Sequence, residues 1–143
     1  MKDIKEIRFC RECGTSFNVE KHHIIYRSEV KALKNCKLNY AYLCPIDHRG
    51  TFGPHGSKGA KRNRKYKLEF QNNLEMLLDK PYLTREEIKE VLDIPDKPLN
   101  SLLKTVERHK DKYVREEVIR ACMAGKLIIE EDNNEKVEVQ SVG

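Results

Sequence analysis

The feature that most constrains this chain is the concentration of cysteine and histidine in its first half. Four of the five cysteines and four of the five histidines lie between positions 10 and 55. Thiolate and imidazole are the main protein ligands for zinc and related metals. The chain has 143 residues and is only 38% hydrophobic, so it buries little apolar core. We therefore expect bound metal to contribute to its stability.

The first motif is a cysteine pair, Cys10 and Cys13, followed by Gly14, which can adopt the positive φ of a tight turn. This arrangement is typical of a zinc knuckle. A redox pair would need a strand–helix–strand setting, which the neighbouring sequence lacks. Cys44 supplies a third zinc ligand. For the fourth, the sequence leaves open Asp47, which repeats the knuckle spacing, and also His48 and Cys36.

The second motif is the pair His22 and His23, in a segment that reads as a β-strand. Neighbouring strand residues point to opposite faces, so the two imidazoles suit different tasks. One can bind a divalent ion that neutralises a phosphate, and the other can act as a general base. Asn39, His48 and His55 follow within a short span, which favours a site over incidental surface polarity.

Charge divides the chain unevenly. Residues 1–80 hold 17 lysines and arginines against 9 acidic residues, and residues 81–143 hold 11 against 14. The basic half suits an anionic polymer such as nucleic acid, although a solvated surface is the alternative. Its densest part is a run of six cations: Lys58, Lys61, Arg62, Arg64, Lys65 and Lys67. An apolar stripe of helical period follows and predicts a helix over about 61–79.

The sequence divides into a domain over 1–80 and a smaller, helical accessory domain over 81–143 with an acidic tail. Thr84 and Glu87 form a capping box that opens a helix. Two further apolar stripes predict two more helices, and residues 127–129 read as a strand. This order resembles a helix-turn-helix with a wing. Reading DNA, forming a homodimer or contacting another protein, and stabilising the first domain are its alternative roles.

Two negative observations bear on location. The first residues contain no apolar segment of the signal-peptide type, and no stretch approaches the roughly 18 apolar residues of a membrane span. We expect a cytoplasmic protein that does not partner a membrane. Thiols stay reduced there, which favours metal binding over disulfides.

The motifs in their order resemble the HNH endonuclease family. The matching positions are Cys10-x-x-Cys13, His22-His23-Ile24, Asn39, and Leu43-Cys44-x-x-Asp47-His48. Residues 44–50 and the later Gly53-Pro54-His55-Gly56 are similar to small HNH proteins of phages and prophages. The resemblance covers residues 8–70. It implies an α+β protein with a ββα-metal core, in which a hairpin carries the two histidines and Asn39 and a helix carries His48.

The resemblance also implies roles for the catalytic residues. His23 would be the general base that deprotonates the attacking water, and Asn39 would hold the loop and orient that base. His22 and His48 would bind Mg²⁺ or another divalent ion. His55 would add a metal ligand or a phosphate contact.

The remaining roles are structural and electrostatic. Structural Zn²⁺ would be held away from the chemistry by Cys10, Cys13, Cys44 and Asp47. Arg49 would stabilise the pentavalent phosphate. The nucleic acid would be bound by Arg49 and by five residues of the basic run, namely Lys58, Lys61, Arg62, Arg64 and Lys65.

The expected function is hydrolysis of DNA phosphodiester bonds, by nicking or double-strand cleavage, leaving a 5′-phosphate and a 3′-hydroxyl. Two alternatives belong to other classes of protein. One is a zinc-stabilised nucleic-acid-binding module without catalysis. The other is a phage-encoded interaction protein whose activity resides in residues 81–143.

Overall fold

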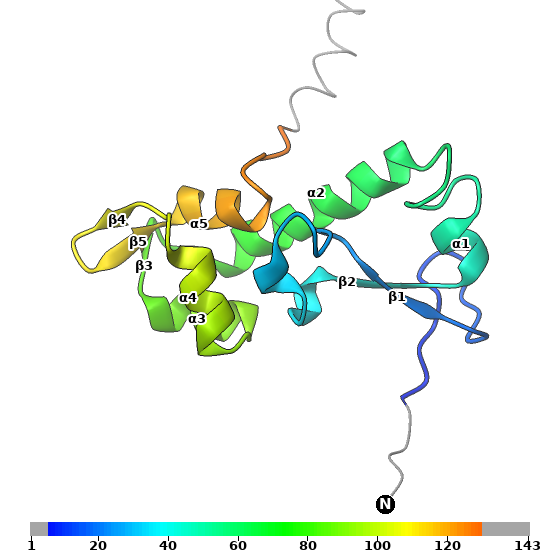
Figure 1. Ribbon diagram of the computed structural model, residues 1–143, viewed down its shortest axis with the longest axis horizontal. Coiled ribbons are helices and arrows are strands. Elements are labelled where there is room, and N and C mark those ends of the chain that lie inside the picture. The colour runs from blue at the N-terminus through cyan, green and yellow to red at the C-terminus, as the bar shows by residue number, and fades with distance from the viewer. Residues whose placement is uncertain (1–5, 130–143) are drawn as a thin grey trace, which may run out of the picture.

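The structure is a computed structural model that describes residues 6–129, and it is a mixed α+β protein (Figure 1). The first half contains two strands, β1 (Glu20–His23) and β2 (Tyr40–Leu43), two 3₁₀ turns, η1 (Lys31–Leu33) and η2 (Lys37–Asn39), and the short helix α1 (Pro45–Arg49). The long helix α2 (Ala60–Leu77) follows. The second half contains β3 (Tyr82–Leu83), α3 (Arg85–Leu92), α4 (Asp96–Leu103), β4 (Arg108–His109), β5 (Lys112–Val114) and α5 (Arg115–Cys122).

Strands β1 and β2 form an antiparallel pair that carries the double histidine. His22 lies opposite Ala41 and His23 lies opposite Tyr40. Burial alternates as the strand period requires: His22 is buried, whereas His23 is half-buried. The β-rich segment and the second strand expected from the sequence are thus both present.

The short helix α1 and then a glycine-rich loop follow β2. Cys44 is the N-cap of α1 and Pro45 is its first residue, where a missing N–H has no consequence. The loop after α1 then folds closely on itself. A Cβ at Gly56 would lie 1.7 Å from the carbonyl oxygen of Gly50, and one at Gly59 would lie 1.6 Å from that of Gly53. Only glycine fits at either position, and this packing fixes the intervening residues, including His55.

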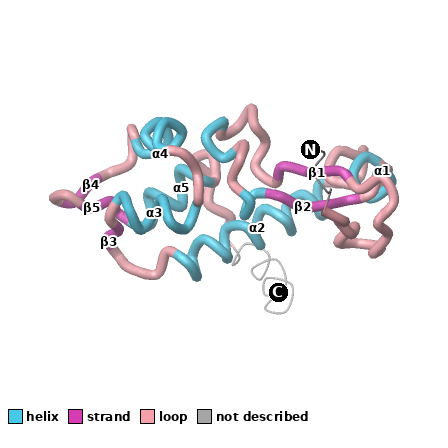
Figure 2. The backbone as a smooth tube through the Cα atoms, turned by 90° about the horizontal axis from the view of Figure 1, so that it is seen from below, coloured by secondary structure: helices cyan, strands magenta, loops and turns pink. Residues whose placement is uncertain are grey.

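Helix α2 runs through the middle of the molecule and joins its two ends (Figure 2). The sequence predicted this helix over about 61–79, and the observed helix spans residues 60–77. Tyr66, Phe70 and Leu74 are its buried apolar residues, and the polar Gln71 is buried beside them. The helix packs against both η2 and α5, so one continuous core extends from Cys10 to Met123.

The second half begins with the expected capping box. Thr84 Oγ1 accepts from the backbone N–H of Glu87 at 3.1 Å, and the Glu87 carboxylate accepts from the N–H of Thr84 at 2.8 Å. Helix α3 follows this capping box as predicted, and α4 and α5 match the two apolar stripes of this half. Strands β3, β5 and β4 form a sheet in that order, with both pairs antiparallel.

The strand predicted at residues 127–129 is wrong. These residues lack regular structure, and the strands of this half precede α5 instead of following it. The Gln71 side chain takes the place of a partner strand. Its amide accepts from the N–H of Ile128 at 2.7 Å and donates to the carbonyl of Ile128 at 2.9 Å. Periodicity cannot reveal a backbone satisfied by a side chain.

Two expectations concern the ends of the chain and membranes. The acidic tail over 130–143 lies outside the described residues. Within residues 6–129, every helix is too short or too polar to cross a membrane.

Candidate functional site

The first candidate metal centre gathers three thiols and a carboxylate. The ligand atoms of Cys10, Cys13, Cys44 and Asp47 all lie within 4.8 Å of one another. Asp47 Oδ2 is 3.2 Å from Cys10 Sγ and 3.3 Å from Cys44 Sγ, and Cys13 Sγ is 3.8 Å from Cys44 Sγ. We call this set the sulfur cluster. It has the four donors that a tetrahedral zinc site needs, and it could hold a metal such as zinc.

Hydrogen bonds favour the deprotonated form of two members of the sulfur cluster, Cys10 and Asp47. Burial raises the pKa of the Cys10 thiol, but hydrogen bonds from the backbone around Cys44, Cys13 and Glu12 outweigh burial and lower it. Burial likewise raises the pKa of Asp47, whereas hydrogen bonds from the three thiols lower it. The net pKa of both groups is lowered. Thiolate and carboxylate are the forms that bind metal. In Cys13 a backbone hydrogen bond at Thr15 lowers the pKa, but burial and the neighbouring thiols and carboxylate outweigh it and raise the pKa to about 11.

Asp47, and not His48 or Cys36, is the fourth residue of the sulfur cluster. Its carboxylate faces the three thiols, whereas His48, one residue later on α1, belongs to a different cluster. Cys36 is buried elsewhere in the core and is not part of either cluster. Successive residues on a helix diverge by about 100°, so α1 can send Asp47 to one cluster and His48 to the other.

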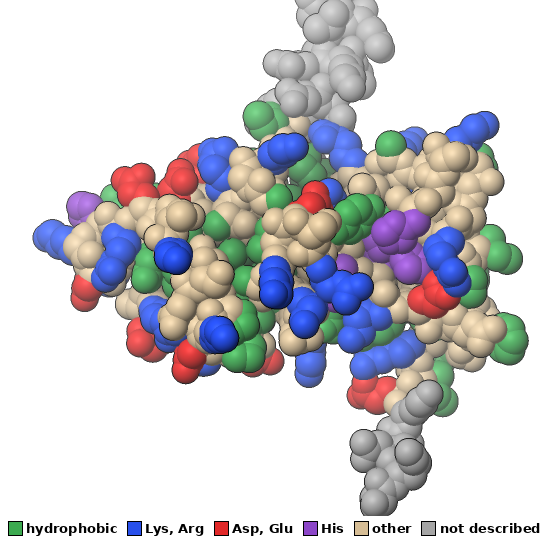
Figure 3. Space-filling model, viewed as in Figure 1, with side chains coloured by type: hydrophobic (Ala, Val, Ile, Leu, Met, Phe, Trp, Pro, Cys, Tyr) green, Lys and Arg blue, Asp and Glu red, His purple; other side chains and the backbone are tan. Residues whose placement is uncertain are grey.

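The second candidate metal centre gathers three imidazoles. Each of His22, His48 and His55 has a ring nitrogen within 4.8 Å of the others, and His22 Nδ1 is 3.2 Å from His48 Nε2. The residues come from β1, α1 and the glycine-rich loop, where the N–H of His55 donates to the carbonyl of His48 at 3.1 Å. We call this set the histidine cluster. Figure 3 shows histidine side chains gathered on one face of the molecule.

Burial favours the neutral, metal-binding form of two members of the histidine cluster, His22 and His55. Burial, and then the charges of His48 and His55, lower the pKa of His22 to about 3. Burial, followed by His48 and Arg49, also lowers the pKa of His55. His22 is 1% exposed, and its Nε2 is buried without a hydrogen-bond partner among the described residues. An ion among the three rings would suit this donor set.

Glu20 orients the histidine cluster, and the sequence reading missed it. Its carboxylate lies 2.7 Å from His48 Nδ1 and also pairs with Arg49. The bond to Nδ1 leaves Nε2 of His48 to face His22, the arrangement of carboxylate, histidine and metal common in metalloproteins. The hydrogen bond with His48 is the main reason that the pKa of Glu20 is lowered. The spacing of Glu20 and His22 in the sequence could have identified Glu20, because the two residues share one face of β1.

His23 borders the histidine cluster without belonging to it. Its Nε2 lies 2.9 Å from the carbonyl oxygen of Lys34. A carbonyl only accepts, so Nε2 carries the proton and Nδ1 keeps its lone pair. A surface pocket of about 500 Å³ contains His23 and all three histidines of the cluster; its other lining residues are Lys21, Tyr26, Arg27 and Ser28.

Asn39 closes the loop between the two strands. It is fully buried; its Oδ1 accepts from the N–H of Ile25 at 2.7 Å, and its Nδ2 donates to the carbonyl of Ile25 at 2.9 Å. A longer bond of 3.4 Å reaches the carbonyl of Leu33. Asn39 thus fixes the loop that leads away from His23, and its amide bonds to backbone instead of to an imidazole.

The basic run lies beside the sulfur cluster. A cleft of about 790 Å³ is lined by all five expected nucleic-acid-binding residues of the run, Lys58, Lys61, Arg62, Arg64 and Lys65, together with Glu12, Phe52 and Leu68. Arg62 turns inward and bonds to the carbonyl of Asp47 at 3.2 Å. Arg49 is engaged as well, through its pair with Glu20. These two guanidinium groups therefore already have protein partners.

Other cations border the histidine cluster. The Lys67 ammonium lies 5.2 Å from the ring centre of Tyr26, and that ring stacks on His55 at 5.3 Å. Lys67 follows Lys65 by two positions, which is about 200° around a helix, so the two point to different sides of α2. Lys21 and Arg27 also line the pocket. Lys67 belongs to the run of six cations, whereas Lys21 and Arg27 lie apart from it in the sequence, and only the fold brings the three together.

Comparison with protein-family models, curated protein sequences and solved structures found no match for this chain.

Proposed function

We propose that this protein is a metal-dependent DNA endonuclease of the HNH type, with its chemistry at the histidine cluster and structural zinc at the sulfur cluster. The observation that carries the proposal is the pocket where His23 adjoins three converging imidazoles. Three protein ligands with an open, solvent-facing side are typical of catalytic metal sites, whereas four filled positions are typical of structural ones.

The ligand atoms of each cluster suit the ion that we propose for it. Three thiols and one carboxylate are a suitable set for zinc, and three converging imidazoles are a suitable set for a second divalent ion. A divalent ion bound there supplies positive charge that stabilises the attacked phosphate and its leaving oxygen. Mg²⁺ is one candidate, although an all-imidazole set also suits softer ions such as Zn²⁺ or Ni²⁺.

The chain's own residues then have distinct tasks. His23 Nδ1 accepts a proton from water as the water oxygen bonds to phosphorus; the bond from phosphorus to the 3′ oxygen breaks, and that oxygen takes a proton from a solvent water. The Lys34 carbonyl holds the ring in the required tautomer. Lys21, Arg27 and Lys67 place positive charge around the pocket and suit the flanking phosphates. The products are a 5′-phosphate and a 3′-hydroxyl.

The finer fold forms part of the same proposal. We assign β1, β2 and α1 to a ββα-metal core, since this hairpin and helix supply His22, His23 and His48. We assign residues 60–114 to a winged helix-turn-helix. The support is the order helix, strand, helix, helix, strand, strand, in which the last strand lies between the other two.

The test is nicking of supercoiled plasmid by wild-type protein and by His23→Ala, with Mg²⁺, Mn²⁺, Ni²⁺ and Zn²⁺ each supplied. Loss of a general base reduces rates by about 10²–10⁴-fold. We expect wild type to nick, and His23→Ala to lose at least about 100-fold in rate while keeping its zinc content and thermal midpoint.

The control is Glu90→Ala, which removes an exposed side chain of α3 in the other half of the chain, outside both clusters. It should nick as wild type does. Unchanged nicking by His23→Ala would remove His23 from the mechanism. If wild type cuts with none of the ions yet binds DNA, the non-catalytic binding module is the better description.

A further inference from the structure

We propose that the exposed face of α4, with the β4–β5 hairpin and η1 beside it, is a second binding surface that takes duplex DNA. The inference rests on the proposed function for its substrate class, but it concerns other residues and another step, namely binding. Its occupant is a B-form duplex, with α4 in the major groove and the hairpin against the adjacent backbone.

The first observation is the division of α4 into two faces. Leu99, Leu102 and Leu103 are buried, and Val106 continues their line into the core. The opposite face carries exposed polar residues with the same helical spacing: Lys97, Asn100, Ser101 and Lys104. Positions i, i+3, i+4 and i+7 lie on one side of a helix. Helix α4 therefore presents a continuous row of hydrogen-bond donors to solvent.

The second observation is that the negative charge on α4 is neutralised. Asp96 is 2.9 Å from Lys89 Nζ and 3.2 Å from Arg85 Nη2, both on α3. Arg85 Nη2 also donates to Asn100 Oδ1 at 2.6 Å, which fixes the amide and leaves its NH₂ group as a donor. The free NH₂ group of a fixed Asn suits an acceptor atom on a base edge or a phosphate, and lysine suits guanine or phosphate.

The third observation is a groove between α4 and η1. It is lined by Lys31, Lys34 and Lys97 with Ala32, Asn35, Pro95, Pro98 and Ser101, and no acidic residue is among them. Since η1 packs on α4, this groove adjoins the polar face of the helix. The Lys34 carbonyl is also the partner of His23, so the groove and the histidine pocket are close in space.

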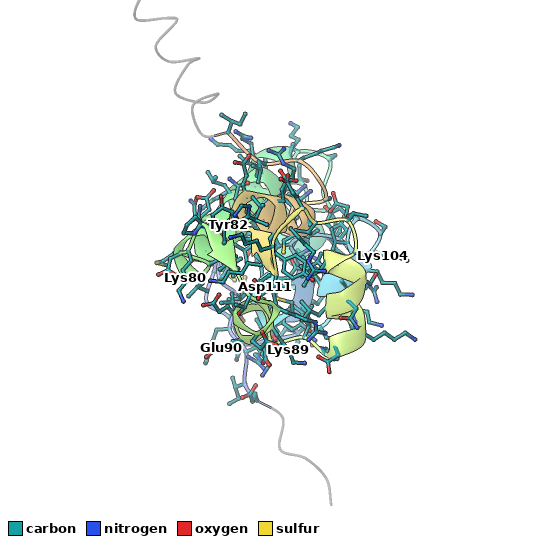
Figure 4. All side chains as sticks on the ribbon, turned by 90° about the vertical axis from the view of Figure 1, so that its left-hand side faces the viewer. Lys80, Tyr82, Lys89, Glu90, Lys104 and Asp111 are labelled. Atoms are coloured by element: carbon teal, nitrogen blue, oxygen red, sulfur yellow. The ribbon has the colours of Figure 1, made fainter. Side chains whose placement is uncertain are left out.

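The fourth observation is the row of exposed cations on the β4–β5 hairpin. Lys110, at the turn between β4 and β5, has φ of 60°, and Arg108, Lys110 and Lys112 are all exposed. Figure 4 shows Lys104 projecting on the side of α4, away from Lys80, Lys89 and Glu90. Lysine and arginine side chains also cross the middle of the face in Figure 3, between the region of α4 and the histidines. In the hairpin the three cations outnumber Asp111 at the turn, and this excess of positive charge complements a phosphate backbone.

The test measures DNA binding in the His23→Ala variant, so that the measured affinity does not depend on cleavage. Zinc-loaded His23→Ala is titrated into a fluorescent duplex of about 24 base pairs, which spans a little over two helical turns. In that background Lys104→Glu should weaken affinity by about tenfold or more and reduce the slope of log K against log salt by about one. Asn100→Ala should reduce discrimination between a selected and a scrambled sequence.

The control is Lys80→Ala, which removes a lysine from the other side of this half and should leave affinity unchanged (Figure 4). Thermal midpoints of all variants are compared, and Lys104→Arg should restore binding. Unchanged affinity in Lys104→Glu, or a wild-type chain that binds no duplex, overturns the inference, as does self-association through α4 in place of DNA binding. If wild type nicks DNA and Lys104→Glu binds DNA normally, the binding surface on α4 is wrong and the endonuclease proposal stands. If wild type binds DNA but never nicks it, only the endonuclease proposal is wrong.

Discussion

The two clusters share helix α1 and yet differ in every property that decides what a bound ion can do. The sulfur cluster has four donors, which would fill all the positions of a tetrahedral ion. The histidine cluster has three donors and borders a pocket. A closed set stabilises a fold, whereas an open set leaves room for substrate. The comparison predicts that damage to one cluster unfolds the protein and damage to the other disables it.

The largest effect should follow loss of the sulfur cluster. Cys10→Ser, or removal of zinc by a strong chelator, should destabilise the first half by several kcal/mol, because structural zinc contributes folding free energy directly. The measurements are zinc content and the thermal midpoint. Cys122→Ser, at a buried cysteine outside both clusters, is the control and should retain its zinc. A Cys10→Ser chain that keeps its midpoint would break the comparison.

Loss of a histidine ligand should have the opposite profile. His55 is exposed and held by a loop, so His55→Ala should leave the thermal midpoint within a few degrees of wild type. Its nicking rate should fall by about 100-fold, or about 3 kcal/mol of transition-state stabilisation. Calorimetric titration of the divalent ion checks whether binding is lost with it. If the variant unfolds, the histidine cluster is structural too.

The dependence of folding stability on pH should show that His22 is buried in its neutral form. Its folded pKa of about 3 lies below the unfolded value, so the unfolded chain binds the extra proton and stability falls as pH drops below about 6.5. At pH 5 this amounts to about 2 kcal/mol relative to pH 7. With zinc bound and no second ion, the loss of stability between pH 7 and pH 5 should be about 2 kcal/mol smaller in His22→Leu than in wild type. Denaturant unfolding at both pH values measures it, and parallel curves would contradict the buried neutral imidazole.

The smallest effect concerns the outer carboxylate. Glu20→Gln keeps the shape of the side chain but removes the charge beside His48. Affinity for the divalent ion should fall by about tenfold, the lower end for such partners because Glu20 also serves Arg49. Glu29→Gln, at a carboxylate that pairs with Lys67 outside the cluster, is the matched control. Equal affinities in the two variants would show that Glu20 does not tune the site.

The membership of each cluster could largely be predicted from the sequence. Spacing placed Cys10, Cys13 and Cys44 together, and the alternating period of a strand separated His22 from His23. Apolar periodicity and the Thr84 capping box gave the helices. These features are local, so they are visible in a single chain.

The rest depended on contacts between distant segments. Glu20 meets His48, and Lys67 meets Tyr26, through the packing of separate elements. Gln71 satisfies Ile128 and so removes the need for a strand there. Short strands such as β3 and β4 are set by their sheet partners rather than by their own two residues.

The most direct test of the two-cluster account is anomalous X-ray diffraction from crystals grown with zinc and soaked in Mn²⁺. We expect two separate metal peaks: zinc among Cys10, Cys13, Cys44 and Asp47, and a second ion among the imidazoles of His22, His48 and His55. Occupancy of the second peak should fall in His55→Ala while the zinc peak stays. A single peak, or a zinc ion that takes His48 as its ligand, would contradict the division into a structural and a catalytic centre.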